Sequence, residues 1–192
     1  MMKLSSLDQV FDLLAAGGGT AYFGEPVTVL EHSLQAAWSI RENGGNDTLV
    51  TAALLHDLGH LLHFEGEDAA QRGLDTRHEE LAVAALAGRL PAAVLDPIRM
   101  HVAAKRFLCF AEPEYLAELS PASVESLALQ GGPMTAAEAE AYLAAPHARE
   151  AIELRRADDI AKTAGLEVPG LDSYRGMVAA LWRDSDIPIQ SE

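Results

Sequence analysis

The segment TAALLHDLGH, residues 51–60, ends an apolar run with His56, Asp57 and His60. A carboxylate among apolar residues is costly to bury unless it is paired or bound to a metal ion. Since a carboxylate has two oxygen atoms, Asp57 can bridge two metal ions. Adjacent helical residues point in different directions, but His56 and Asp57 can converge on a metal near the helix end, where Gly59 would let the chain turn.

Three further histidines, His32, His78 and His101, lie among apolar neighbours in other segments with helical patterns. Four imidazoles in one core, counting His56, would leave several desolvated polar groups if they shared no partner. Neutral imidazole is the commonest metal ligand, and helical bundles build metal sites from inward-facing residues of neighbouring helices. The pattern therefore predicts a metal centre inside a bundle.

A second carboxylate is needed to complete the first metal site, and the segment LRRADDIAK offers Asp158 and Asp159. With Asp158 chosen, one metal ion would be held by His32, His56, Asp57 and Asp158. The other would be held by Asp57, His78 and His101. Imidazole and carboxylate ligands with open positions suit iron, manganese or zinc better than calcium.

Helical patterns follow one another along the whole chain, and no alternating strand pattern or repeat interrupts them. The predicted helices cover residues 7–16, 27–43, 47–60, 76–90, 91–108, 120–130, 135–145, 147–165 and 172–182. We therefore expect an all-α fold, a compact helical bundle that forms a single domain over residues 1–192. The tail from about residue 184 is expected to be frayed.

Several helix boundaries have local signals. Asn46 is a good N-cap residue, and Thr76 with Glu79 and Thr135 with Glu138 have the spacing of capping boxes. Pro97 lies inside the segment 91–108 and predicts a kink or a break into two helices.

The net charge of −15 argues against nucleic acids and anionic membrane surfaces as partners, because both repel an acidic protein. The single cysteine, Cys109, excludes an internal disulfide and is typical of a reducing compartment. There is no apolar run of about 18 residues or more that would span a membrane, and Asp8 and Asp12 argue against a signal peptide. We expect a cytoplasmic protein that acts on a small molecule, and no obligate protein partner is evident.

The order of histidines and aspartates along this helical chain resembles the HD-domain superfamily. The segments YFGEP, LEHSLQAA, AALLHDLGH, HVAAKR, QGGPM, RRADD and VPG…YR, between about residues 22 and 175, more closely resemble the PhnZ-type HD-domain oxygenases. This resemblance implies a mixed-valent diiron site, Fe(II)/Fe(III), that uses O2. It also implies cleavage of the carbon–phosphorus bond of a 1-hydroxy-2-aminoethylphosphonate. The substrate would be 2-amino-1-hydroxyethylphosphonate, giving glycine and phosphate, or its N-trimethylated analogue in the TmpB-like branch, giving glycine betaine and phosphate.

By the same resemblance, His32, His56, Asp57 and Asp158 match the ligands of one iron, and Asp57, His78 and His101 match those of the other. Tyr22 and Glu25 match a mobile loop pair of catalytic residues, of which the tyrosine can occupy an iron and the glutamate meets the substrate amine. His60, Lys105 and Arg155 match residues around the phosphonate. Phe23 and the apolar segment 61–64 would suit a methylated ammonium, which prefers aromatic faces, so both substrates stay open.

Two other functions remain open at this stage. A metal-dependent HD-domain phosphohydrolase would use the same ligands to direct a metal-bound water at phosphorus. A tyrosine that occupies an open metal position, as expected for Tyr22, would block that water. The second of these functions is that of a non-catalytic module whose fold is stabilised by a metal ion.

Overall fold

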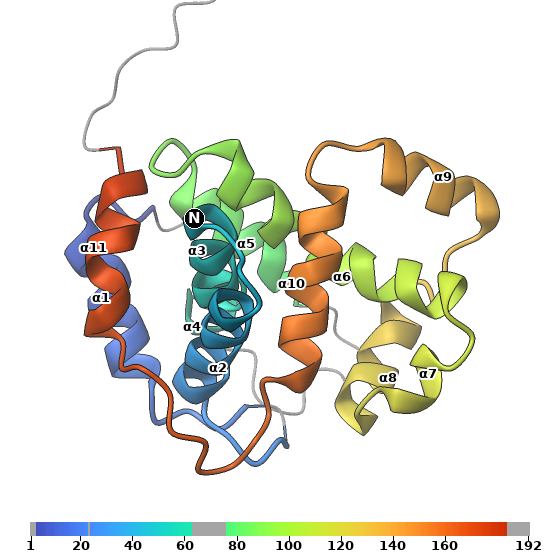
Figure 1. Ribbon diagram of the computed structural model, residues 1–192, viewed down its shortest axis with the longest axis horizontal. Helices are drawn as coiled ribbons and strands as arrows, with labels where there is room; N and C mark the ends of the chain where they lie inside the picture. Colours follow the sequence, from blue (N-terminus) through green and yellow to red (C-terminus); the bar gives the residue numbers. More distant parts are fainter. Residues whose placement is uncertain (1–2, 23, 63–75, 184–192) are drawn as a thin grey trace, which may run out of the picture.

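The computed structural model describes residues 3–22, 24–62 and 76–183, and in these residues the regular secondary structure is helical (Figure 1). The one extended feature among them is an isolated antiparallel bridge between Ala21 and Thr28. The predicted all-α HD-domain fold is confirmed. Phe23, His63, Phe64 and the tail from residue 184, which entered the sequence predictions, lie outside the described residues.

The helices are α1 (Leu7–Gly17), α2 (Val29–Glu42), α3 (Asp47–Leu55), α4 (Leu58–Leu62), α5 (His78–Leu86), α6 (Ala92–Ala111), α7 (Tyr115–Glu118), α8 (Pro121–Leu129), α9 (Ala136–Ala144), α10 (Ala148–Ile160) and α11 (Asp172–Leu181). Helix α10 stands near the middle of the molecule, with α1–α5 and α11 on one side and α7–α9 on the other (Figure 1). It packs against both α6 and α2.

The segment 47–60 was expected to be one helix that turns at Gly59, and this expectation is wrong. The chain leaves the helix at His56 and Asp57, between α3 and α4, whereas Gly59 lies inside α4. A Cβ atom added at Gly59 would lie 1.9 Å from the carbonyl oxygen of His78. Gly59 is therefore needed for the close approach of α4 to the start of α5, because any side chain there would collide with backbone.

The capping box predicted for Thr76 and Glu79 is also wrong. Helix α5 begins at His78, and its N-cap residue Arg77 has a left-handed backbone with φ of 47° and makes no side-chain cap hydrogen bond. Packing sets the start of this helix, because His78 lies against Gly59 and Asp57. The capping box of Thr135 and Glu138 and the Asn46 cap are confirmed.

Pro97 does not divide the segment 91–108. Helix α6 runs without a break from Ala92 to Ala111 and contains Pro97 in its N-terminal half. The missing N–H group removes one helical hydrogen bond, but Pro97 and Ile98 are buried, so tertiary packing holds the helix together. Conversely, α10 ends at Ile160, short of the expected residue 165.

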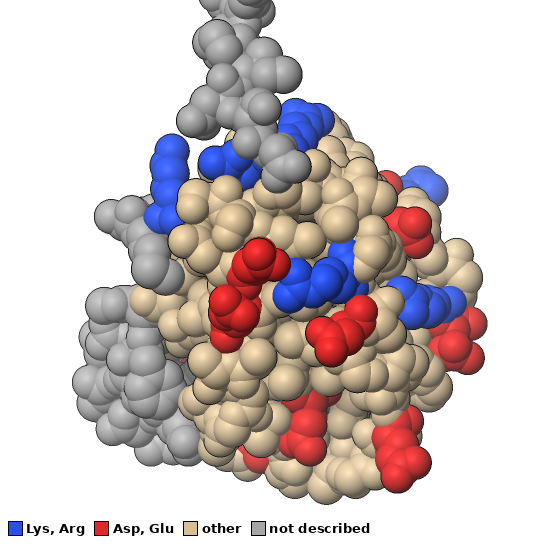
Figure 2. Space-filling model, turned by 90° about the vertical axis from the view of Figure 1, so that its left-hand side faces the viewer, with Lys and Arg blue, Asp and Glu red and all other residues tan. Residues whose placement is uncertain are grey.

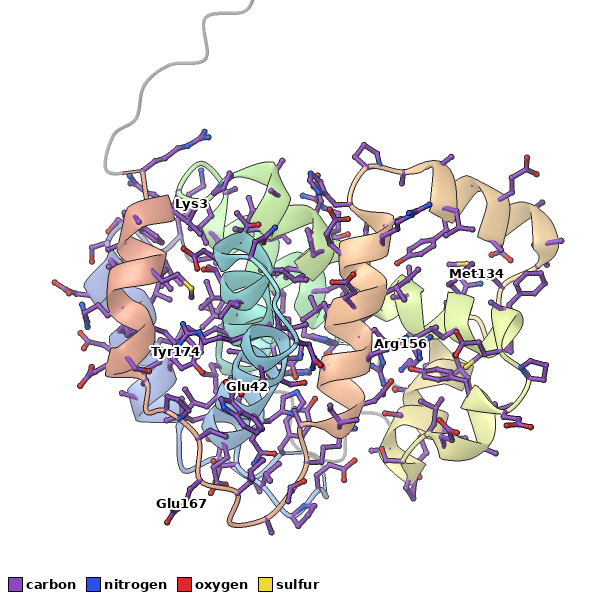
Figure 3. The ribbon with its side chains drawn as sticks, viewed as in Figure 1. Lys3, Glu42, Met134, Arg156, Glu167 and Tyr174 are labelled. Atoms are coloured by element: carbon purple, nitrogen blue, oxygen red, sulfur yellow. The ribbon has the colours of Figure 1, made fainter. Side chains whose placement is uncertain are left out.

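Two clusters of buried apolar side chains meet at the central helices. The larger one joins α1, α2, α3, α5 and α11, and Tyr174 of α11 is fully buried in it (Figure 3). The smaller one contains Met134 and lies among α6, α7, α9 and α10. Helices α6 and α10 contribute to both clusters, which supports the proposal that the chain folds as one domain.

The face that α1 and α11 form carries acidic and basic side chains in alternation with uncharged surface (Figure 2). Near Phe11 of α1, Arg175 of α11 forms an ion pair with Asp8 at 2.7 Å and lies over the phenylalanine ring. Within the described ranges, no helix has the length and apolar character that crossing a membrane requires.

Replacing Gly59 with alanine should destabilise the metal-free protein strongly, by about 2–3 kcal/mol, because the new Cβ forces α4 away from α5. Chemical denaturation measures this change. Gly176→Ala in α11 is the matched control, since its Cβ would meet no atom within 4 Å, and it should be neutral or slightly stabilising. Equal effects of the two substitutions would contradict the close-approach argument.

Candidate metal centre

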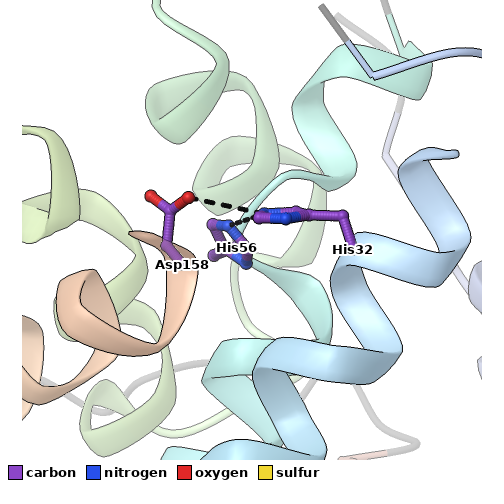
Figure 4. A group of neighbouring side chains, drawn as sticks. All are labelled: His32, His56 and Asp158. Atoms are coloured by element: carbon purple, nitrogen blue, oxygen red, sulfur yellow. Dashed lines mark hydrogen bonds and ion pairs between the residues drawn. The ribbon is translucent and has the colours of Figure 1, made fainter. Parts of the chain in front are cut away.

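One group of side chains that could hold a metal ion comes from three segments that are far apart in sequence (Figure 4). His32 lies in α2, His56 follows α3, and Asp158 lies near the end of α10. The Nε2 atom of His32 is 3.2 Å from Nε2 of His56 and 3.5 Å from Oδ1 of Asp158. All three side chains are buried.

A second group lies around the other side of Asp57. The Nε2 atoms of His78 in α5 and His101 in α6 are 3.0 Å apart. They lie 3.2 Å and 3.9 Å from Oδ1 of Asp57. His60 in α4, which was expected near the phosphonate, also faces this oxygen at 3.8 Å and stacks on the ring of His78.

Asp57 joins the two groups through its two oxygen atoms. Oδ1 faces His78, while Oδ2 lies 3.5 Å from Nε2 of His32 and 3.4 Å from Nε2 of His56. Among the described residues, Oδ2 is buried and accepts no hydrogen bond. A buried carboxylate oxygen without a partner is costly, and a metal ion between these atoms would satisfy it. This geometry fits a bridging role for Asp57.

The tautomers of the histidines point to the same conclusion. The Nδ1 atoms of His32, His56 and His101 lie 2.7–2.9 Å from the backbone carbonyls of Ala161, Ala53 and Ile98. Since a carbonyl only accepts, each Nδ1 donates and each Nε2 of the neutral rings presents a lone pair. In the pair His32 and His56, two lone pairs therefore face each other, an arrangement that a cation between them stabilises.

Burial favours the neutral form of His32 and His101, the form in which an imidazole binds a metal ion. It lowers the pKa of His32 to about 4 and that of His101 to about 3. For the carboxylates, burial alone would raise the pKa. The neighbouring His56 holds the pKa of Asp57 well below its usual range, and Arg155 does the same for Asp158. Neutral His32 and His101 beside ionised Asp57 and Asp158 are ready to bind a metal ion.

Arg155, expected near the phosphonate, is extensively paired inside the protein. Its Nη1 donates to Asp158 Oδ2 at 2.7 Å, its Nη2 to Asp159 and Ser123, and its Nε to the Tyr115 hydroxyl. Tyr115 in turn donates to Asp159. Arg155 thus orients Asp158, and whether it also meets substrate stays a prediction. The sequence offered Asp159 only as an alternative ligand, and gave no signal for Tyr115.

Lys105 of α6 lies close to Arg155 in the interior. Its ammonium donates to Ser126 Oγ at 2.6 Å, and burial followed by the charge of Arg155 lowers its pKa to about 7. Ser123 contacts both cations, through its carbonyl with Lys105 and its hydroxyl with Arg155. An anion bound beside Lys105 would offset the effect of its burial and favour its charged form.

The loop before α2 contains Tyr22, which lies against the first group, and Glu25, which lies beside the end of α10. The Tyr22 ring stacks on His32 with 4.0 Å between ring centroids, and burial raises the pKa of its phenol, as do Asp57 and Asp158. Glu25 lies 3.4 Å from the ammonium of Lys162, which follows α10. Sequence reasoning missed Lys162. Its one sequence signal is its position four residues after Asp158.

Known proteins with similar sequences indicate the family to which the chain is related. No family model matches the chain. The chain is 40% identical over 161 residues to a 1-hydroxy-2-(trimethylamino)ethylphosphonate dioxygenase (glycine-betaine-forming) of Leisingera caerulea, covering 84% of this chain and 82% of the relative. It is 43% identical over 157 residues to a hydroxymethylphosphonate dioxygenase of Gimesia maris, covering 81% of this chain and 78% of the relative. An uncharacterised protein of Acanthamoeba polyphaga mimivirus is 30% identical over 177 residues, covering 91% of this chain and 81% of the relative.

Asp57→Ala should abolish binding of both metal ions, because each group loses the shared carboxylate. His101→Ala, by comparison, removes a ligand from the second group alone and should leave about one ion bound per chain. Elemental analysis of the purified variants after reconstitution with iron measures the metal content. Retention of one ion by Asp57→Ala would contradict the bridging arrangement.

The free energy of unfolding of the metal-free protein should fall as the pH is lowered from 7 to 5. The unfolded chain binds protons at His32 and His101 near their ordinary pKa of 6.5, whereas the folded chain binds them only near pH 4 and 3. The unfolded state therefore gains protons first, and His78, whose pKa is raised through Asp57 despite burial, offsets part of the effect. His60, whose pKa burial also lowers, adds to the loss, which should total roughly 4 kcal/mol by denaturant titration.

Lys105→Met is the control for this pH dependence. Because the folded pKa of Lys105 is about 7, against 10.5 in the unfolded chain, its titration makes stability rise only above about pH 7. The variant should lose the rise above pH 7 and keep the loss between pH 7 and 5. A stability that is flat between pH 7 and 5 would show that these imidazoles are not held neutral.

Proposed function

The chain belongs to the PhnZ/TmpB-like family of organophosphonate oxygenases, and we propose that it uses O2 to cleave the carbon–phosphorus bond of a 1-hydroxyphosphonate. The observation that carries this proposal is the bridging carboxylate of Asp57 between two buried histidine groups, in a chain 40–43% identical to phosphonate dioxygenases. One O2 is consumed per substrate, the C1–P and one C1–H bond break, and a carboxylate and phosphate leave.

The metal centre is proposed to hold two iron ions in the states Fe(II) and Fe(III). His32, His56, Asp57 and Asp158 would hold one ion, and Asp57, His78 and His101 the other. These ions supply the redox chemistry with O2 that protein side chains lack. His60 lies 3.8 Å from Asp57 Oδ1 and faces the second ion, where its ring would meet either the ion or the substrate.

The side chains around the centre bind and orient the substrate. Lys105 and Arg155 are buried cations, so they favour the phosphonate dianion and hold its C1 carbon beside the metal ions. A dianion next to Lys105 would also keep that amine protonated, against the effect of its burial. Tyr22 covers the first group through its stack on His32 and excludes water until substrate enters.

Glu25 is proposed to meet the cationic end of 2-amino-1-hydroxyethylphosphonate or of its N-trimethylated analogue. Its carboxylate is mostly shielded from solvent, and Oε1 accepts no hydrogen bond from the described residues. A third candidate substrate is hydroxymethylphosphonate, on which a relative acts according to its name. The ion pair of Glu25 with Lys162 favours this candidate, because it already neutralises the carboxylate. Formate and phosphate would then be the products.

The phosphohydrolase alternative shares the ligand set, but it lacks support from relatives, since the two with a named activity are dioxygenases. We further propose a cytoplasmic location, which the single cysteine supports. The partner is a small phosphonate, as it is for both named relatives by their names.

Phosphate release tests the function directly. Iron-loaded protein should release phosphate from at least one of the three hydroxyphosphonates in the presence of O2, and release should stop under argon. A phosphomonoester such as p-nitrophenyl phosphate serves as the control substrate, and Asp57→Ala as the control protein. Release from the phosphomonoester without O2, and none from the phosphonates, would replace the oxygenase with the hydrolase.

A further inference from the structure

Lys162 lies at a junction of three segments of the candidate site. Its ammonium is 3.4 Å from Oε1 of Glu25 in the loop before α2, and 3.5 Å from Oγ of Ser120, the N-cap residue of α8. The side chains of Lys162 and Glu25 are 13% and 15% exposed. Lys162 is also close enough to Asp158 to help lower the pKa of that carboxyl. A cation therefore stands beside the substrate-facing carboxylate and the first metal group.

The backbone of Lys162 is fixed on both sides. The carbonyl of Ala161 accepts the Nδ1 hydrogen of His32. Thr163 exchanges two hydrogen bonds with the side chain of Gln35, at 3.0 Å through its N–H and 2.8 Å through its carbonyl. Since both His32 and Gln35 belong to α2, only the side chain of Lys162 is free to change position relative to the metal centre.

The ion pair itself is loose. Charge-assisted hydrogen bonds between ammonium and carboxylate measure about 2.7–2.9 Å, whereas this pair measures 3.4 Å and leaves Oε1 without a hydrogen bond among the described residues. Removing the Oε1 atom from water without a good donor is costly. A donor or cation of better geometry can therefore displace Lys162 from Glu25.

We propose that Lys162 is a specificity-determining residue, an internal cation that occupies Glu25 and competes with the cationic end of an incoming phosphonate. The inference rests on the proposed function. A substrate with an ammonium group must separate the ion pair and bring a second positive charge beside Lys162, which opposes binding. A substrate with an uncharged tail leaves the pair intact. The pair therefore shifts selectivity toward hydroxyphosphonates without a cationic group.

Two ligands that differ only in the charged group measure this selectivity. They are 2-amino-1-hydroxyethylphosphonate and 1-hydroxyethylphosphonate, titrated by calorimetry into iron-loaded protein under argon, where the oxygenase cannot turn over. The measured quantity is the ratio of their dissociation constants. Lys162→Met removes the charge and keeps most of the side-chain volume, and it should shift the ratio toward the ammonium ligand by about tenfold.

Two further variants complete the experiment. Lys162→Arg keeps the positive charge and should keep the wild-type ratio within about twofold. Lys162→Gln repeats the charge removal if the methionine variant does not fold. In Glu25→Gln, the Lys162→Met substitution should change the ratio much less, because the carboxylate for which the cations compete is absent.

The outcomes separate the inference from the proposed function. If neither phosphonate binds wild-type protein, the proposed function fails and the inference with it. If both bind and Lys162→Met changes the two dissociation constants equally, Lys162 only supports the loop and the inference alone is overturned. A selective loss of the ammonium ligand in Lys162→Met would also overturn it, since competition predicts the opposite sign.

Discussion

The site depends on one buried carboxylate whose two oxygen atoms face different histidine groups. Asp57 is nearly inaccessible to water, and burial alone would favour its protonated form. The imidazoles around it reverse that preference, so Asp57 stays ionised among histidines of α2, α4, α5 and α6, at the break that follows α3. The break between α3 and α4 makes this possible, because a continuous helix would point His56 and Asp57 away from each other.

Backbone carbonyls fix the direction of three of the proposed histidine ligands. His56 and His101 each donate to a carbonyl three residues earlier in the chain, so their rings are oriented by their own helices. His32 instead donates to Ala161 at the end of α10, a residue 129 positions away. Helix α10 thus supplies a proposed ligand, Asp158, and its end supplies the carbonyl that orients His32. Its early end at Ile160 is what exposes that carbonyl, since the last carbonyls of a helix have no partner within it.

The sequence predicted the helical class correctly, and it pointed to the histidines and aspartates that the structure brings together, because both have local signals. Apolar periodicity identifies the helices, and histidines among apolar residues identify the metal groups. Local signals failed where contacts between distant segments determine where a helix starts or why a residue is needed. The threonine at 76 has good capping chemistry, but His78 is placed by its contacts with Asp57 and Gly59. Gly59 appeared to be a turn residue, although its missing side chain serves packing. The sequence gave no signal for Tyr115 and only a weak one for Lys162, because their partners Asp159 and Glu25 lie in distant segments.

The charge of the site argues for a dianionic ligand. Two divalent or more highly charged ions would outweigh the two carboxylates Asp57 and Asp158, because the remaining ligands are neutral imidazoles. Lys105 adds a buried amine, and Asp159 alone offsets the charge of Arg155, since Asp158 is already counted against the metal ions. Tyr22 does not offset this excess of positive charge, since its raised pKa keeps the phenol neutral in the metal-free protein. A phosphonate dianion supplies the missing negative charge, whereas a water molecule or a neutral substrate would leave a buried positive charge uncompensated.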